Sequence, residues 1–289
     1  MFPANFGYVA ASSVEEALQL MAQHGENGKL LAGGHSLIPA MKLRLQSPQT
    51  LIDLGTVPGL RGVSVDGNNL VIGALTVHAD VASSDLVRKH VPALAEAAAV
   101  IGDVQVRNRG TIGGSVAHAD PAADLPVVLT ALNASFIAQS ASGKREIGVD
   151  DFFTDFYTTA LKANEILTEI RVPIPAAGTG TAYVKLPHPA SGYVVVSAAA
   201  VVTRRASGTC TASRIAIGGL GSGPIRAIAT ELALQGKPLT TQMIASAAAQ
   251  AAEETDPVED SYAGAEYKRH VATVFARKAI EAAVERAGR

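Results

Sequence analysis

Two short glycine-pair segments constrain the local fold of this chain more than any other feature. They are residues 32–36 (Ala-Gly-Gly-His-Ser) and 111–115 (Thr-Ile-Gly-Gly-Ser), each with a small hydroxyl residue beside the pair. Glycine has no Cβ, so bare backbone N–H groups can close on an anion. One such segment is typical of an ordinary turn, in which glycine supplies a positive φ. Two similar ones indicate loops that grip one extended phosphate-bearing ligand, and a dinucleotide is the natural candidate.

The composition excludes several classes of function. The 289 residues carry a formal net charge of −2, which gives no reason to expect nucleic acid as a partner. The single cysteine, Cys210, cannot form an intramolecular disulfide or supply the four thiolates of an iron–sulfur cluster. His35 and His118 lack a second His or Cys at ligand spacing, so we expect no metal site. If this protein handles electrons, its metal centres must therefore lie in another chain.

The sequence also bears on location. The longest apolar stretch, residues 193–202, is too short to span a bilayer and contains the β-branched residues of a buried strand. The first residues lack the basic and apolar segments of an export signal. A lone cysteine fits a reducing compartment. We expect a cytoplasmic protein without a transmembrane segment.

The order of predicted elements indicates an α+β protein. Ser13 and Glu16 form a capping box that begins a helix, and Gly25 ends it. The prolines and glycines of residues 173–180 mark a domain boundary. Strands are predicted at residues 29–32, 51–54, 63–65, 70–72, 135–138, 147–149, 165–172, 182–186, 193–203 and 211–218, and further helices at 79–87, 93–101, 124–132 and 267–287.

Other motifs fail on inspection. The glycine-rich run 219–223 follows a strand, but Pro224 stands where a dinucleotide fingerprint needs its third glycine. The chain has no Gly-x-x-x-x-Gly-Lys-Ser/Thr phosphate loop and no Gly-x-Ser-x-Gly nucleophile elbow. The reactive group would therefore be a bound cofactor.

The chain resembles a known family, the FAD-binding medium subunits of the molybdenum hydroxylases (the xanthine dehydrogenase superfamily). The likeness covers essentially the whole length and is nearest to the medium subunits of aerobic carbon monoxide dehydrogenases. The motifs that carry it are residues 32–39 with 41–44, 111–114, Asp120-Pro121 with Asp124, 165–167, 183–186 and 265–268.

The resemblance implies a two-lobed FAD-binding domain of the vanillyl-alcohol-oxidase (PCMH) type over residues 1–175, with lobes of about 1–55 and 56–175. It implies a C-terminal domain over residues 176–289, with a three-stranded antiparallel sheet and a helical bundle. The boundary suggested by the prolines and glycines falls at the same place.

The resemblance also implies roles for individual residues. Ile101 and Leu167 would pack on the flavin or the adenosine, and Asp124 and Lys185 would bond polar edges of FAD. Tyr193 would cover the isoalloxazine ring and control access to it, as the one catalytic candidate. The residues expected around the pyrophosphate are Ala32, Gly33, Gly34, His35, Ser36, Leu37, Thr111, Gly113, Gly114 and Ser115.

By resemblance, the chain is the electron-transfer subunit of a heterotrimeric molybdenum hydroxylase with non-covalent FAD. Electrons would come from [2Fe-2S] clusters of a small subunit and leave through FAD to a quinone or another acceptor. A large subunit would carry the molybdenum cofactor, and the assembly would be a dimer of heterotrimers. The complex could associate peripherally with the inner face of the cytoplasmic membrane.

Two other functions stay open from the sequence. One is a stand-alone FAD-dependent reductase of the same fold. Such a reductase needs an acidic residue beside the flavin, and no residue of the sequence is identified for that role. The other is a non-catalytic assembly factor that carries flavin to an oxidoreductase.

Overall fold

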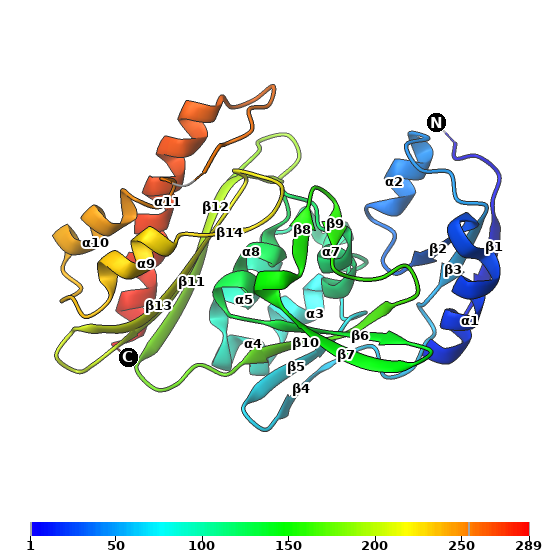
Figure 1. Cartoon of the computed structure of the whole chain (residues 1–289), viewed down its shortest axis with the longest axis horizontal. Helices are drawn as coiled ribbons and strands as arrows, with labels where there is room; N and C mark the ends of the chain where they lie inside the picture. The colour runs from blue at the N-terminus through cyan, green and yellow to red at the C-terminus, as the bar shows by residue number, and fades with distance from the viewer. Residues whose placement is uncertain (1, 254, 289) are drawn as a thin grey trace.

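Three β-sheets with packed helices are laid out along the long axis of the molecule (Figure 1). The computed structural model describes residues 2–253 and 255–288. The first sheet belongs to a small N-terminal lobe, the second to a middle lobe and the third to the C-terminal region. A two-stranded hairpin, β8 (Phe153–Asp155) with β9 (Thr158–Thr159), stands apart from them. The predicted α+β class is confirmed.

The N-terminal lobe is a parallel sheet in the order β1-β3-β2, and helix α1 crosses from β1 to β2. Ser13 caps α1 by accepting a hydrogen bond of 3.1 Å from the Glu16 N–H. The Glu16 carboxylate accepts from the Ser12 N–H at 2.7 Å, so the capping box closes one residue earlier than its sequence pattern predicts. The elements are β1 (Gly7–Ala10), α1 (Val14–His24), the 3-10 turn η1 (Gly25–Asn27), β2 (Gly28–Leu31), α2 (Leu37–Lys42) and β3 (Thr50–Asp53).

The middle lobe is a five-stranded antiparallel sheet in the order β4-β5-β10-β6-β7. The helix predicted over residues 79–87 is two helices, because Ser84 has an extended backbone and its hydroxyl caps the second helix. The strands are β4 (Val63–Asp66), β5 (Asn69–Gly73), β6 (Ser135–Ser140), β7 (Gly143–Gly148) and β10 (Ile166–Pro173). The helices are α3 (His78–Ser83), α4 (Asp85–His90), α5 (Pro92–Ala99), α6 (Val104–Arg107), α7 (Ile112–His118), α8 (Asp124–Ala131) and the 3-10 turn η2 (Val149–Asp151).

The C-terminal sheet lies between two layers of helices. Helices α5 and α8 of the middle lobe pack on one face, and α9 to α11 cover the other (Figure 1). Strand β12 is therefore buried on both faces, which explains its nearly continuous apolar sequence. The elements are β11 (Thr179–Pro187), β12 (Val194–Arg204), β13 (Cys210–Gly218), β14 (Ile225–Arg226), α9 (Ile228–Leu234), α10 (Thr241–Ala248) and α11 (Ala265–Arg286).

The expected three-stranded sheet has a fourth strand, because β14 pairs with β13 through two residues. Two residues are too few to show a period-2 pattern in the sequence. None of the helices in residues 2–253 and 255–288 combines the length and hydropathy that a membrane-spanning segment requires.

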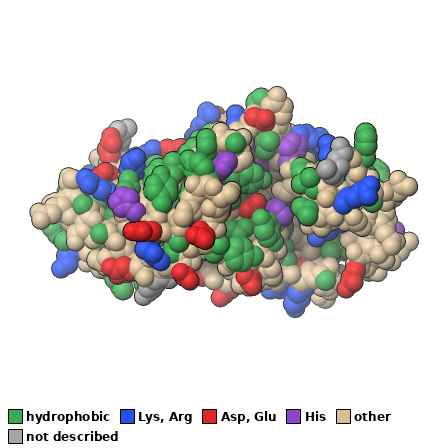
Figure 2. Space-filling view, turned by 90° about the horizontal axis from the view of Figure 1, so that it is seen from above, with side chains coloured by type: hydrophobic (Ala, Val, Ile, Leu, Met, Phe, Trp, Pro, Cys, Tyr) green, Lys and Arg blue, Asp and Glu red, His purple; other side chains and the backbone are tan. Residues whose placement is uncertain are grey.

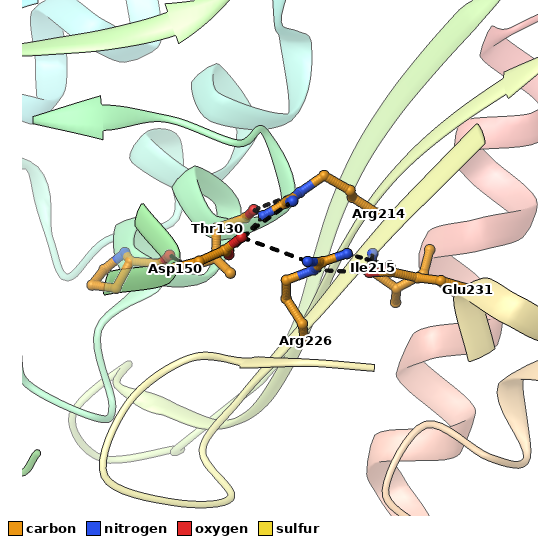
Figure 3. A network of polar contacts seen from close by, with 7 residues as sticks. Thr130, Asp150, Arg214, Ile215, Arg226 and Glu231 are labelled. Carbon is orange, nitrogen blue, oxygen red and sulfur yellow. Dashed lines mark hydrogen bonds and ion pairs between the residues drawn. The ribbon is translucent and has the colours of Figure 1, made fainter. Parts of the chain in front are cut away.

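A network of arginines and carboxylates joins the C-terminal sheet to the middle lobe (Figure 3). The Arg214 guanidinium donates to the Thr130 carbonyl oxygen at 3.1 Å and to the Asp150 carboxylate at 2.8 Å. Thr130 lies in the last turn of α8, so a positive group meets the negative end of the helix dipole. Arg226 lies 3.6 Å from the other Asp150 oxygen and pairs with Glu231. We call these five residues the seam network.

Arg214→Ala is expected to lower the free energy of unfolding by about 2 kcal/mol, because charge-assisted hydrogen bonds at a helix end are lost. Arg277→Ala is the matched control, since it removes only an exposed pair with Glu281 on α11. That change should cost about 0.5 kcal/mol or less. Urea unfolding measures both, and equal costs for the two variants would contradict a stabilising role for the seam network.

Candidate functional site

The first glycine pair forms a turn between β2 and α2 that leaves a run of backbone N–H groups free. Gly34 has φ +77°, a left-handed conformation that favours glycine, and its carbonyl accepts from the Ile38 N–H at 2.9 Å. In the described part of the chain, no protein acceptor receives the backbone N–H groups of five successive residues: Gly33, Gly34, His35, Ser36 and Leu37. Such a run of free donors is suited to an anion.

The second glycine pair is not the loop that the sequence predicts, because it forms the first turn of α7. Thr111 is the N-cap, and its hydroxyl oxygen accepts from the Gly114 N–H at 3.0 Å. The N–H groups of Ile112 and Gly113 donate to carbonyl oxygens of the preceding segment, Thr76 at 2.9 Å and Ala74 at 2.8 Å. These amides are therefore already used. The second segment offers a ligand the half-buried Ser115 hydroxyl group and the bare Cα of Gly114, whereas Thr111 is buried.

The structure brings the two segments together, as expected. A Cβ built on Gly33 would overlap the Arg109 carbonyl oxygen, and one built on Gly114 would lie 3.9 Å from the Ala32 Cβ. A Cβ on Gly113 would lie 2.5 Å from the Ala74 Cβ. Much of the need for glycine here is thus close packing of backbone on backbone. We call these two segments together the glycine cluster.

His78 lies beneath the glycine cluster, and sequence reasoning missed it. Its side chain is buried, its ring packs on Gly110, and its Nδ1 has no hydrogen-bond partner among the described residues. Burial, assisted by the nearby His35, lowers the pKa of His78 to about 4. The ring is neutral at pH 7.

Asp124 and Lys185 form a buried ion pair with each other at 2.8 Å. The Lys185 ammonium also donates to the carbonyl oxygens of Val100 and Gly192, at 2.9 and 2.8 Å. Its three donors are therefore all used within the chain, so the bond to FAD that the resemblance implies would have to replace one of these contacts. The Tyr183 hydroxyl donates to the same Asp124 oxygen at 2.8 Å. Burial raises the pKa of Asp124, while Lys185 and Tyr183 act in the opposite direction.

Tyr193 ends the loop of residues 188–193, which begins after β11. The His188 N–H donates to the Tyr193 carbonyl oxygen at 2.7 Å, and Lys185 holds the neighbouring Gly192 carbonyl. The Tyr193 side chain is 46% exposed, which suits a cover over a ligand better than a core position. Beside it is an open cavity of about 290 Å³ whose walls include Asp120, Tyr157, His188, Tyr193, Val194 and Asp260.

Ile101 and Leu167 have different surroundings. Ile101 is half-buried and follows Val100, whose carbonyl oxygen holds Lys185. Leu167 is 7% exposed and belongs to the hydrophobic core of the middle lobe, so core packing already accounts for most of its side chain. Figure 2 shows the molecule from above the view of Figure 1. The surface is hollowed between the N-terminal lobe at the right and the rest of the molecule.

Comparisons with known proteins bear on this site. A family model described as "FAD binding domain in molybdopterin dehydrogenase" matches residues 4–175, and "CO dehydrogenase flavoprotein C-terminal domain" matches residues 181–283. The carbon monoxide dehydrogenase medium chain of Hydrogenophaga pseudoflava is 43% identical over 283 residues, which is 98% of each chain. The chain belongs to the molybdopterin dehydrogenase flavoprotein family.

Solved structures agree with this membership. The carbon monoxide dehydrogenase of Hydrogenophaga pseudoflava that lacks the Mo-pyranopterin moiety of its molybdenum cofactor matches with a TM-score of 0.95 at 44% identity, covering 99% of both chains. Quinoline 2-oxidoreductase from Pseudomonas putida 86 matches with a TM-score of 0.94 at 32% identity, covering 100% of both. The family resemblance is confirmed, and this flavoprotein-family chain is an oxidoreductase subunit with a FAD-binding domain.

The substitution Lys185→Met tests the buried ion pair between Asp124 and Lys185. We expect unfolding to become easier by about 3 kcal/mol at pH 8, because Asp124 loses the cation that faces it. Without that cation the pKa of Asp124 rises further. A carboxyl group with a raised folded-state pKa stabilises the fold at low pH and loses that contribution as the pH rises through it. The deficit should therefore be smaller at pH 5.

The measurement is urea unfolding at pH 5 and pH 8. Lys144→Met is the control, because Lys144 is exposed and this change should cost about 0.5 kcal/mol or less at either pH. A Lys185→Met deficit that is the same at both pH values would show that Lys185 does not keep Asp124 charged.

Proposed function

We propose that this chain binds FAD without a covalent bond, at the glycine cluster between the N-terminal and middle lobes, and serves as an electron-transfer subunit. The observation that carries the proposal is the run of five unpartnered N–H groups at Gly33–Leu37, set against α7. Those donors fit a pyrophosphate, and the half-buried Ser115 hydroxyl group would add a further donor. FAD supplies the ability to exchange electrons one or two at a time.

The other predicted site residues follow the axis of α7. Its seven residues span about 10 Å, which separates the glycine cluster at one end from His118 at the other. We assign the ring end of FAD to the His118 side, where Tyr193 would cover it. Asp124 and Lys185 would meet its polar edge after exchanging one of their present contacts, and Ile101 and Leu167 would add apolar contact.

We propose that this subunit works with a small [2Fe-2S] subunit and a large molybdenum-cofactor subunit, as a dimer of heterotrimers. The Hydrogenophaga pseudoflava enzyme is described as lacking one moiety of its molybdenum cofactor. Cys210, the single cysteine of this chain, is buried. The proposal keeps the expected domains, a FAD-binding domain over residues 1–175 and a C-terminal domain over residues 176–289. Carbon monoxide is the first substrate to test, on 43% identity, although a quinoline oxidoreductase shares the fold at 32%. The similar scaffold of these differently named enzymes supports the proposal that the large subunit chooses the substrate.

The acceptor in this proposal is a quinone. A quinone is dissolved in the membrane, so the assembled complex would meet it at the cytoplasmic membrane face.

Gly34→Ala tests the FAD assignment. A Cβ at φ +77° strains the turn and lies 3.2 Å from Ile38, so the free N–H groups should lose their alignment. We expect FAD affinity to fall by about tenfold or more, measured as quenching of flavin fluorescence. Gly208→Ala is the matched control, since Gly208 has φ +82° with open space around it in the turn after β12. Equal losses in both variants, or none in Gly34→Ala, would contradict the assignment.

Copurification tests the assembly. We expect a tagged chain to bring down small and large partner chains in equal amounts, with iron and molybdenum in the complex. A flavin-only monomer that reduces a substrate with NADPH would show the stand-alone reductase instead. Loosely held flavin, no turnover and transient partners would show an assembly factor.

A further inference from the structure

Apart from Tyr193, the cavity beside this tyrosine has walls that the proposed FAD contacts do not use. Its volume is about 290 Å³, and its walls come from four separate segments. They include Asp120 after α7, Tyr157 in the β8–β9 turn, His188 with Tyr193 in one loop, and Asp260 before α11. We propose that this acceptor cavity binds the head group of a neutral quinone, which accepts the electrons of the flavin. The inference rests on the proposed function.

The size of the acceptor cavity limits what can enter it. Pockets for drug-sized ligands begin at about 300 Å³, whereas a cavity of about 150 Å³ is enough for benzene. The volume of about 290 Å³ therefore fits one substituted ring.

Aromatic rings are concentrated around this cavity. Tyr157 and Tyr193 line it, and Tyr262 backs His188 with ring centroids 4.8 Å apart, so three of the six tyrosines of the chain gather here. The Tyr157 ring is held against His118 at 5.2 Å. Aromatic side chains fixed in this way present apolar faces on which a flat ring can stack. Their hydroxyl groups and the His188 ring provide polar atoms for the carbonyl oxygens of a quinone.

The charges at the cavity select against anions. Asp260 accepts from the Tyr262 N–H and pairs with Lys268, and the pKa of Asp260 is lowered to about 2, so it is ionised. Asp120 adds a second carboxylate, and no Lys or Arg from the described residues lines the cavity. Because Lys268 already neutralises Asp260, the lining formed by the described residues offers no free cation to hold a phosphate-bearing acceptor, whereas an uncharged ring needs none.

The position of the cavity matches the transfer. Tyr157 touches His118, the last residue of α7, and the glycine cluster lies at the first turn of the same helix. With the ring end of FAD assigned to the His118 side, as in the proposed function, that ring lies on the cavity side. Reduction of a quinone takes two electrons and two protons. Reduced flavin carries both, so the products are oxidised flavin and hydroquinone.

The experiment uses the FAD-loaded full-length chain and the redox-inert quinone analogue 2-heptyl-4-hydroxyquinoline N-oxide. Calorimetric titration is expected to show saturable binding that Tyr157→Ala and His188→Ala each weaken about tenfold. Flavin content, read from absorbance, should stay at the wild-type level in both. Tyr267→Ala is the matched control, since this tyrosine is 51% exposed on α11 outside the cavity, and it should bind the analogue like the wild type.

Three results would overturn the inference. They are no saturable binding to wild-type protein, unchanged affinity in both cavity variants, or displacement of the analogue by an equal concentration of NAD⁺. His188→Gln, which keeps a polar group of similar size, replaces His188→Ala if that variant does not fold, and it should still weaken binding. Failure of the proposed function is read separately, because wild-type protein would then lack flavin absorbance before any analogue is added.

Discussion

The close approach of backbone to backbone at Gly33 is the constraint on which the proposed cofactor cleft depends. Gly33 packs against the Arg109 carbonyl, and Gly113 packs against Ala74, so neither position has space for a Cβ. The Gly33 contact brings the N-terminal lobe against the middle lobe, and the Gly113 contact fixes α7 within the middle lobe. The first segment, with its free N–H groups, then lies beside the start of α7. The proposed anion binding would thus depend on how tightly the two segments pack.

The buried pair of Asp124 and Lys185 sets the other end of the site. Asp124 begins helix α8 of the middle lobe and Lys185 lies in β11, so one ion pair joins this helix to the C-terminal sheet. Lys185 also holds the carbonyl oxygen of Gly192, immediately before Tyr193. The direction in which the Tyr193 side chain leaves the backbone therefore depends on a contact between domains. The seam network repeats the arrangement at the far end of α8, where Arg214 reaches the Thr130 carbonyl.

The sequence predicted the parts of the fold that rest on local patterns. The apolar run of β12 and the cap at Ser13 are examples, since each is visible within about ten residues. The loop expected at Thr111 was wrong because the Thr111 hydroxyl caps a helix, a signal present in the sequence but outweighed by the glycines. Contacts that join distant segments were beyond reach. Periodicity could not place His188 near Tyr157 or show that Lys185 would spend its donors on the chain itself.

Strand β12 has one more consequence. Its central side chains are the small residues Ser197, Ala198, Ala199 and Ala200, and helices pack against both of its faces. Small side chains let those helices approach closely. The size of these side chains therefore sets the distance between the two helical layers of the C-terminal half. Tyr193 precedes the same strand. Larger side chains in place of the β12 alanines would therefore shift Tyr193, the proposed cover of the flavin. No residue proposed to contact a ligand would need to change.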